Sequence, residues 1–285
     1  MKNENRFYQD LKPFLSCKDF TVSGEEYDVV LNEKYNMLVT QPVPFDLGSY
    51  YESENYISHT DSKKSLFDKV YQFVKKQSLQ KKLTLINSFK TEQKTILDVG
   101  AGTGDFLNIC KNNNWEVFGT EPNSSARNLA KEKGVALEKD LSFYQNKKFD
   151  VITLWHVLEH VRDLSNFIKQ LKQLLKPNGR LVIAVPNFKS YDAKHYKQFW
   201  AAFDVPRHLF HFSQEAIQKL FLEVNMKVEK TLPMKYDSYY VSLLSEKYKS
   251  GKSNPLKSFW IGFKSNQKAK RSSEYSSLIY VIKNN

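Results

Sequence analysis

Between residues 90 and 185, short apolar runs alternate with stretches of helical pattern, and this alternation constrains the fold more than any other feature. The apolar runs TILDV, WEVFGT, VALE, KFDVITLW and RLVIAV predict strands at residues 95–99, 115–120, 135–138, 148–155 and 180–185. The clearest helix follows Asp163, because Leu164, Ile168 and Leu171 recur on one helical face. Strands that alternate with helices are joined by right-handed crossovers, so the pattern predicts a parallel, doubly wound α/β sheet.

The segments on either side of this alternation differ from it. Residues 1–50 contain short alternating runs and the turn-like QPVPFD, which predict a small β-rich appendage. Residues 51–90 are rich in lysine and predict a helical lead-in to the main α/β domain, which we place at residues 91–285. Two aromatic segments, 187–212 and 236–272, interrupt this domain and are expected to act as cover insertions.

The glycine-rich stretch ILDVGAGTGDFL, residues 96–107, predicts a ligand site, and its spacing excludes two phosphate-binding motifs. A P-loop needs Gly-Lys-Ser/Thr at its end, but Gly104 is followed by Asp105 and Phe106. A dinucleotide fingerprint that begins at Gly100 needs its third glycine at position 105, which is an aspartate. The loop therefore binds something other than a phosphate or pyrophosphate group.

Carboxylates around this loop favour a cationic ligand that carries no phosphate. Asp98 and Asp105 bracket the glycines, and Glu121, which ends the second strand, follows Gly102 by 19 residues. Fixed negative charge disfavours a pyrophosphate, whereas a carboxylate at the position of Glu121 can accept both hydroxyls of a ribose. S-adenosylmethionine satisfies both conditions, because it joins an adenosine to a cationic tail.

Four ordered motifs over roughly residues 95–190 resemble those of class I S-adenosylmethionine-dependent methyltransferases: ILDVGAGTGDFL, FGTEPNSSA, FDVITLWHVLEHVRD and LKPNGRLVIAVPN. The stretches YYESENYISHTDS, PRHLFHF and DSYYVSLLSEKYK are similar to a bacterial branch of this family. That branch is related to quinone-precursor O-methyltransferases and deoxysugar C-methyltransferases. The resemblance implies a Rossmann-like sheet of seven strands whose last strand, SSLIYVIK at 276–283, runs antiparallel.

The resemblance also implies an N-terminal module, which in this branch often carries paired cysteines. This chain has only Cys17 there, and a structural zinc site needs about four ligands. We therefore expect residues 1–50 to be a degenerate, zinc-ribbon-like appendage without metal. Its core is expected to consist of Phe20, Val22, Tyr27 and Val29.

By the same resemblance, the cofactor would bind at the carboxyl edge of the sheet, where the loops after the strands meet. The methionine and ribose side would be lined by Asp98, Gly100, Ala101, Gly102 and Gly104. The ribose and adenine side would be lined by Glu121, Pro122, Asn123 and Asp140. Trp155 and His156 would face the methyl group.

Methyl transfer to a hydroxyl or a carbon acid requires removal of a proton, and histidine suits that role near neutral pH. His156 and His208 are the candidate general bases, and Arg207 is a candidate for holding an anionic acceptor. His156 could instead pack against adenine or cap a helix. Asp204 could pair with Arg207 at the surface and leave His208 structural. A metal bound by His156 and His160 is disfavoured, because HVLEH lacks the order of H-E-x-x-H.

Charge bears on the alternative functions. The net charge of +12 rests mainly on lysine, with only six arginines, and dispersed lysine mostly indicates a solvated surface. The fourth strand ends in LWHV and not in the Asn/Asp-Pro-Pro-aromatic turn used on base amines. We expect O- or C-methylation of a small-molecule, sugar or lipid-linked acceptor. A nucleic-acid methyltransferase and a catalytically inactive cofactor-binding module are the alternatives.

Hydropathy and cysteine content bear on location. The sequence has no apolar run of the roughly 18 residues that a membrane span needs. Its two cysteines, Cys17 and Cys110, do not make a disulfide framework, which favours the reducing cytoplasm. The sequence leaves the oligomeric state open.

Overall fold

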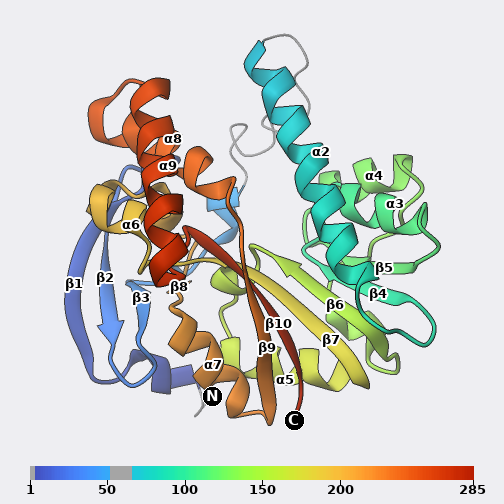
Figure 1. The fold of residues 1–285 in the computed structure, drawn as a ribbon. Coiled ribbons are helices and arrows are strands. Elements are labelled where there is room, and N and C mark those ends of the chain that lie inside the picture. Colours follow the sequence, from blue (N-terminus) through green and yellow to red (C-terminus); the bar gives the residue numbers. More distant parts are fainter. Residues whose placement is uncertain (1–3, 52–65) are drawn as a thin grey trace.

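The computed structural model describes residues 4–51 and 66–285, and a large sheet forms its centre (Figure 1). The strands of this sheet are β4 (Thr95–Val99), β5 (Glu116–Thr120), β6 (Phe149–Trp155), β7 (Leu175–Pro186), β9 (Met226–Pro233) and β10 (Ser277–Asn284). Their order is β5-β4-β6-β7-β10-β9. The strands β4 to β7 run parallel, whereas β10 pairs antiparallel with both β7 and β9. The predicted doubly wound sheet with an antiparallel last strand is confirmed.

Within the described residues the sheet has six strands instead of the expected seven, because VALE does not form a strand. A single parallel bridge joins Glu138 to Thr120 at the edge of β5. Asp140 then caps a 3-10 helix that begins at Leu141, so the chain leaves the sheet edge after one paired residue. Val135 is buried in the core below the edge, which accounts for the apolar pattern that suggested a strand.

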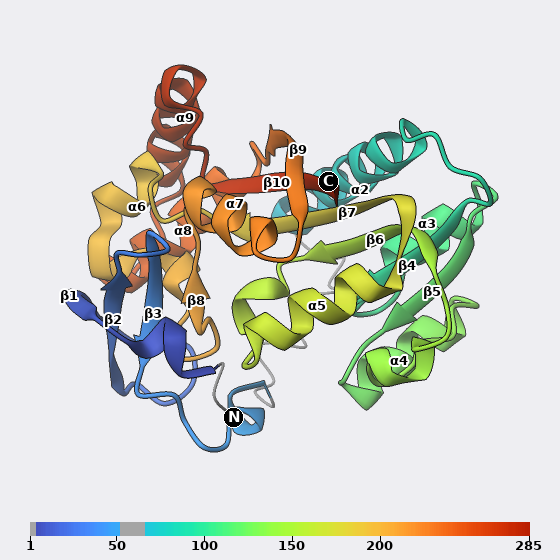
Figure 2. The same cartoon turned by 90° about the horizontal axis from the view of Figure 1, so that it is seen from below.

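Helices cover both faces of the large sheet (Figures 1 and 2). One face packs against α2 (Leu66–Asn87), α3 (Asp105–Lys111) and α4 (Ser124–Glu132). The other face packs against α5 (Leu164–Leu174) and α7 (Gln214–Leu222). Adjacent residues of β7 point to opposite faces of the sheet, as in any strand. Leu181 packs on the face covered by α5 and α7, and Val182 packs on the face covered by α2, α3 and α4.

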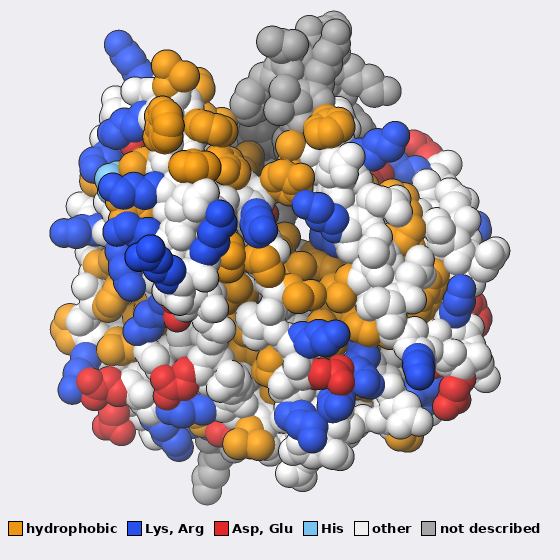
Figure 3. Space-filling view, viewed as in Figure 1, with side chains coloured by type: hydrophobic (Ala, Val, Ile, Leu, Met, Phe, Trp, Pro, Cys, Tyr) orange, Lys and Arg blue, Asp and Glu red, His pale blue; other side chains and the backbone are white. Residues whose placement is uncertain are grey.

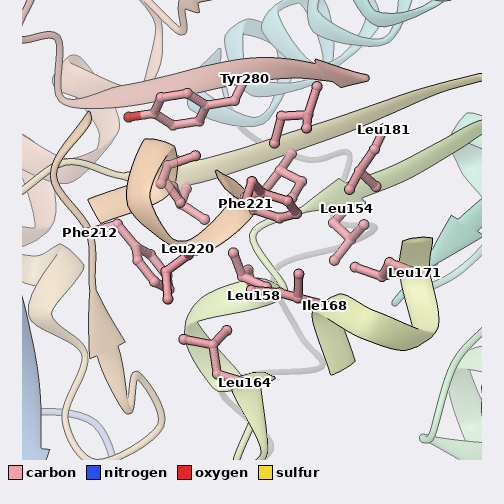
Figure 4. Close-up of a cluster of buried hydrophobic side chains, with 14 of the residues drawn as sticks. Leu154, Leu158, Leu164, Ile168, Leu171, Leu181, Phe212, Leu220, Phe221 and Tyr280 are labelled. Atoms are coloured by element: carbon pink, nitrogen blue, oxygen red, sulfur yellow. The ribbon is translucent and has the colours of Figure 1, made fainter. Parts of the chain in front are cut away.

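Helix α5 illustrates how the local sequence builds this core. The Asp163 side chain accepts a hydrogen bond from the Asn166 backbone N–H at 2.9 Å and starts the helix. Leu164, Ile168 and Leu171 then point into one cluster with side chains of β6, β7, α7 and β10 (Figure 4). The predicted cap and apolar face are both present, and the helix ends at Leu174, where β7 begins.

A second, smaller sheet contains the N-terminal strands and one strand from far along the chain. Its strands are β1 (Leu11–Lys18), β2 (Glu26–Asn32), β3 (Met37–Gln41) and β8 (Phe210–His211). All neighbours pair antiparallel, and β8 adds Phe210 opposite Val39 and His211 opposite Leu38. The β-rich appendage predicted at residues 1–50 therefore shares a sheet with the first cover segment.

The predicted core of this appendage was half right. Tyr27 and Val29 on β2 are buried, but Phe20 and Val22 are 37% and 43% exposed. The two exposed residues lie between β1 and β2, outside the sheet, and so cannot pack on its inner face. Phe20 instead stacks on Tyr248 of the second cover segment, with ring centroids 4.7 Å apart.

The two cover segments lie together above the small sheet, on one side of the large one (Figure 1). The first contains α6 (Tyr191–Tyr196), the 3-10 turns η6 (Lys197–Phe199) and η7 (Ala201–Phe203), and β8. The second contains α8 (Asp237–Ser250) and α9 (Pro255–Ser272). The other short 3-10 helices are η1 (Glu4–Tyr8), η2 (Gly48–Tyr51), η4 (Leu141–Tyr144) and η5 (Leu158–His160).

The helical lead-in expected at 51–90 is represented by α2, whereas its first part and most of the motif YYESENYISHTDS lie outside the described residues. Across the ranges 4–51 and 66–285, no helix is both long enough and apolar enough to cross a membrane.

Phe210 tests whether the small sheet and the main domain unfold together. Its buried ring contacts Phe7 and Tyr8 of η1, with centroids 5.7 and 6.2 Å away. Phe210→Ala should lower the free energy of unfolding by about 3–5 kcal/mol in urea denaturation, because it leaves a cavity between distant segments. The matched variant Phe143→Ala, at a ring that is 67% exposed, should change it by less than about 0.5 kcal/mol. Equal effects of the two variants would contradict this packing.

Candidate active site

The glycine loop makes a tight turn between β4 and α3, and one of its glycines borders open space. Gly100 and Gly102 have positive φ angles of 69° and 54°. A Cβ atom on Gly100 would lie 2.6 Å from Val157 Cγ2, so this position requires glycine for packing. A Cβ on Gly102 would meet no atom of the described residues within 4 Å. The backbone at Gly102 is therefore accessible to a ligand.

Glu121, directly after β5, reaches back to the same loop. Its Oε2 accepts a hydrogen bond from the Gly102 backbone N–H at 2.9 Å, and its Oε1 accepts one from Asn123 N–H at 2.9 Å. Each carboxylate oxygen has a second lone pair, so Glu121 can still accept hydrogen bonds from the hydroxyls of a sugar. The structure thus brings Glu121 and Gly102, 19 residues apart in sequence, into direct contact.

The other residues expected on the adenine side serve the local fold. The Asn123 side chain caps α4 by accepting from Ala126 N–H at 3.0 Å. Asp140 caps η4 by accepting from Ser142 N–H at 2.9 Å. Pro122 is exposed beside Asn123. These residues border the region next to Glu121, and their capping bonds account for their polar side chains without a ligand.

The two carboxylates that bracket the loop have different surroundings. Asp98 is buried at the end of β4 and accepts a hydrogen bond from Thr153 Oγ1 at 2.5 Å, and burial raises its pKa to about 7. Asp105 forms ion pairs with Lys75 at 2.7 Å and Lys133 at 2.6 Å. Its charge is balanced inside the protein, so Asp98 is the better placed of the two to act on a ligand.

Lys82 of α2 brings a cation into the site that the sequence analysis did not single out. Its Nζ lies 4.2 Å from the centroid of the Trp155 ring at the end of β6. Burial lowers the pKa of Lys82 to about 8, and the charges of Asp98 and Asp237 oppose this shift. The Trp155 Nε1–H is buried without a hydrogen-bond partner among the described residues. In the sequence, Lys82 is one of many lysines on a predicted helix, so only the fold could identify it.

His156 follows β6 and lies between two carboxylates. Its Nδ1 is 3.3 Å from Glu159 Oε1, and its Nε2 is 3.2 Å from Asp237 Oδ2. Burial alone would lower the pKa of His156, but the hydrogen bonds and charges of Asp237 and Glu159 outweigh it and raise the pKa to about 10. At neutral pH, His156 is therefore an imidazolium and does not accept a proton.

His208 lies in the first cover segment, 8% exposed, and its ring orientation is defined by the backbone. Its Nδ1 is 2.9 Å from the carbonyl oxygen of Ala202. This contact assigns the hydrogen of the neutral ring to Nδ1 and leaves the lone pair on Nε2. The Nε2 atom is 3.9 Å from Asp204 Oδ2, close enough for the carboxylate to stabilise a positive charge on the ring.

Glu159, His160 and His208 form a cluster whose donor atoms all lie within 4.8 Å of one another. Glu159 is fully buried, and its Oε2 has no hydrogen-bond partner among the described residues. His160 Nδ1 contacts the Tyr51 hydroxyl at 2.9 Å and the Arg207 carbonyl oxygen at 3.1 Å. Burial and the charge of His208 lower the pKa of His160 to about 4, so it is neutral. From the sequence, His160 was considered as a metal ligand together with His156, but in the fold it lies beside His208.

Arg207 is 3% exposed, and its guanidinium is engaged within the protein. It donates to both carboxylate oxygens of Asp204, at 3.0 and 2.5 Å, and to the Thr21 hydroxyl. It also reaches the Tyr50 carbonyl oxygen at 3.4 Å and lies 3.6 Å from Asp19 Oδ1. The predicted alternative of an Asp204–Arg207 pair is present, but its arginine is buried and its aspartate half-buried. These partners leave little of the guanidinium for an anionic acceptor.

A cavity of about 870 Å³ adjoins His156 and His208. Both cover segments line it, through residues such as Ala202 and Tyr240, as do Pro186 at the end of β7 and Ser277 at the start of β10. The small sheet's loops add Phe20, Thr21 and Tyr50 to the wall. No local pattern in residues 1–50 indicated this contribution, which depends on the long-range pairing of β3 with β8.

Known proteins match this chain in sequence. The sequence model of a family described as "Methyltransferase domain" matches residues 56–231. The ubiquinone biosynthesis O-methyltransferase of Actinobacillus pleuropneumoniae is 37% identical over 108 residues, which cover 33% of this chain and 46% of the relative. That of Histophilus somni is 35% identical over 116 residues, covering 35% and 48%. The chain thus spans about half the length of the curated relatives it matches.

Solved structures show the same fold. The magnesium protoporphyrin IX methyltransferase of Synechocystis with bound SAH has a TM-score of 0.56 at 15% identity, covering 83% of this chain and 97% of that chain. The structure of that protein with bound SAM has a TM-score of 0.50 at 13% identity, covering 83% and 94%. At such identities the likeness concerns the fold alone.

The two carboxylates beside His156 predict an unusual titration. Because its pKa in the folded protein lies above the ordinary value of 6.5, the protonated ring stabilises the fold fully below pH 6.5. This contribution is lost as the pH rises through about 10. Asp237→Asn removes one carboxylate and should lower the His156 midpoint by about one to three pH units in an NMR titration. His195, whose pKa shift does not involve Asp237, is the internal control. A midpoint near 6.5 in the unmodified protein would contradict the assigned ion pairs.

Proposed function

This chain belongs to the methyltransferase-domain family of class I S-adenosylmethionine-dependent enzymes, and on that premise we propose that it methylates an oxygen of a small-molecule acceptor. The acceptor would occupy the cavity of about 870 Å³. The observation that carries the proposal is the placement of His208 in the wall of that cavity, with its Nδ1 on the Ala202 carbonyl oxygen and its Nε2 left as the atom that can take a proton. The names of the matched O-methyltransferases support oxygen as the methyl acceptor.

The residues around the glycine loop fit S-adenosylmethionine, which supplies an electrophilic methyl group when bound. The open side of Gly102 allows close approach to the backbone, and Glu121 is placed to accept from ribose hydroxyls. Asp98 and Lys82 suit the ammonium and carboxylate of an amino acid, because an opposite charge bound beside them favours their ionised forms and counters the burial that brings their pKa values to about 7 and about 8. The protein would therefore hold the cofactor at both its sugar and its amino-acid end.

We assign the general base to His208 in preference to His156. The two carboxylates beside His156 keep its ring protonated at neutral pH, so it cannot take a proton there. The Nε2 of His208 carries a lone pair and can remove the hydrogen of an acceptor hydroxyl. His156 then contributes a positive charge to the cavity wall, where it would orient an acceptor with an anionic or electron-rich group.

Asp204 and Arg207 support His208 without touching the acceptor oxygen. Burial would raise the pKa of Asp204, but the hydrogen bonds from Arg207 lower it, so the carboxylate stays ionised. An ionised Asp204 at 3.9 Å stabilises the imidazolium that forms when His208 takes a proton. We therefore propose that Arg207 is a positioning residue, in place of the acceptor-binding role considered from the sequence.

Gly102→Val tests the cofactor site. The added side chain points into space that no described residue occupies, so it should abolish S-adenosylmethionine binding in calorimetry. A valine at a φ of 54° also strains the backbone, so the control has to carry the same strain. Gly134→Val is the matched control, because Gly134 also has a positive φ and its nearest neighbour to a Cβ is Lys111 Nζ at 3.5 Å. If both variants bind the cofactor like the unmodified protein, the loop is not the binding site.

His208→Asn tests the base, because asparagine can keep the hydrogen bond to the Ala202 carbonyl oxygen but cannot take the proton. The acceptor is first identified by mass spectrometry, from the deuterated methyl group that S-adenosyl-L-[methyl-D3]methionine transfers to a metabolite extract. With that acceptor, His208→Asn should lower kcat by roughly 100- to 10,000-fold and leave cofactor affinity nearly unchanged. His195→Asn, at a histidine that does not line the cavity, should keep full turnover. Unchanged kcat in His208→Asn would reject the assignment.

A further inference from the structure

Helix α9 is inverted, because it exposes large apolar side chains and buries small or polar ones. Its buried residues are Ser258, Gly262, Ser265, Asn266 and Ala269. Its exposed apolar residues are Leu256, Phe259, Trp260 and Phe263, which we call the apolar stripe. Their spacing of three, four and seven residues places them on one side of the helix, and Leu256 and Trp260 are 79% and 63% exposed.

Specific contacts prevent the helix from turning this stripe inward. Ser265 Oγ donates to the buried carboxylate of Asp192 at 2.6 Å. The Asn266 side chain donates to Ser238 Oγ on α8 at 2.9 Å. A Cβ on Gly262 would lie 2.9 Å from the Ser238 carbonyl oxygen, so the two helices pack closely at this point. The inner face of α9 is thus satisfied by polar bonds, and the stripe has no place in the core.

The stripe forms one continuous aromatic surface. Phe259 stacks on Tyr239 of α8 with ring centroids 5.3 Å apart, and Phe263 lies 6.5 Å from Phe259. The Trp260 ring meets Phe263 edge-on at 5.8 Å. Contiguous exposed apolar surface of this kind marks an interaction site, whereas scattered exposed residues need no explanation.

Basic side chains surround the stripe. Residues 237–272 contain eight lysines and arginines and two acidic residues. The resulting net charge of +6 is half of the +12 of the whole chain. One of those acids, Glu246, is already paired with Lys257 at 3.0 Å. Lys252, Lys264 and Lys270 are exposed on or beside α9. Figure 3 shows hydrophobic and basic side chains gathered over this corner of the molecule.

We propose that α9 docks this protein onto the surface of an anionic lipid bilayer. Trp, Phe and Leu side chains enter the boundary between headgroups and acyl chains, and the flanking lysines bind anionic headgroups. A second copy of the chain would bring two basic surfaces together, which like-charge repulsion disfavours. A nucleic acid would match the charge but would leave the aliphatic and aromatic stripe against phosphates.

Docking through α9 would also place the cavity near the lipid. Tyr240, Lys247 and Gly251 line the cavity, and all three belong to α8 or to its C-terminal end, which leads directly into α9. An acceptor with an apolar tail could then reach His208 from the bilayer. This extension rests on the proposed function, whereas the docking itself does not.

The test is co-sedimentation of the full chain with vesicles of phosphatidylcholine alone and of phosphatidylcholine mixed with phosphatidylglycerol. We expect binding to the anionic vesicles that weakens with salt, and little binding to the neutral ones. Trp260 is the most exposed of the four tryptophans, so its fluorescence should shift to shorter wavelength on binding. Absence of binding, or equal binding to both vesicles, would overturn the proposal.

Matched variants locate the surface. Phe259→Ser with Trp260→Ser should weaken vesicle binding at least about tenfold, whereas Leu222→Ser, at a leucine 61% exposed on α7, should not. Lys252→Glu with Lys270→Glu should also weaken vesicle binding at least about tenfold, whereas Lys227→Glu with Lys230→Glu on β9 should have a smaller effect.

Unchanged S-adenosylmethionine affinity shows that each variant is folded. Full binding by the stripe variants, stripe-dependent dimers in sedimentation, or stripe-dependent RNA retention on filters would each overturn the proposal.

Discussion

The arrangement of the candidate active site depends on the ion pair between the buried guanidinium of Arg207 and the half-buried carboxylate of Asp204. Through its guanidinium, Arg207 joins the loop after β1, at Thr21 and Asp19, to the first cover segment. Its carbonyl oxygen accepts from His160, and Asp204 faces His208. Removing one member of a buried pair leaves an uncompensated charge, which typically costs 3–5 kcal/mol. The ion pair between Arg207 and Asp204 thus connects the wall of the cavity, the proposed base His208 and the small sheet.

In the same region, two histidines differ in the groups that surround them. His156 contacts two carboxylates and stays protonated, whereas the Nδ1 of His208 contacts a backbone carbonyl oxygen. Glu159 takes part in both environments, because it pairs with His156 and one of its carboxylate oxygens lies within 4.8 Å of a nitrogen of His160 and of His208. A site of this kind can offer a positive charge and a proton acceptor to one ligand at the same pH.

The parts of this structure that the sequence predicted are those that depend on local spacing. The start of α5 at Asp163 and the apolar face of that helix follow from short-range rules. The errors have long-range causes. VALE is apolar because Val135 packs below the sheet edge, and Phe20 is aromatic because it stacks on Tyr248. Lys82 meets Trp155 across 73 residues and Arg207 meets Thr21 across 186, and no local pattern records contacts between segments so far apart.

The pairing of β3 with β8 has a consequence for how the chain is made. Val39 emerges from the ribosome about 170 residues before Phe210, the residue opposite it. At the usual 5–20 residues per second, the small sheet waits on the order of ten to thirty seconds for its last strand. During that interval the edge of β3 lacks its neighbour, and such an edge attracts other strands. Biosynthesis of this protein therefore includes a period in which β1, β2 and β3 have to be kept apart from other chains.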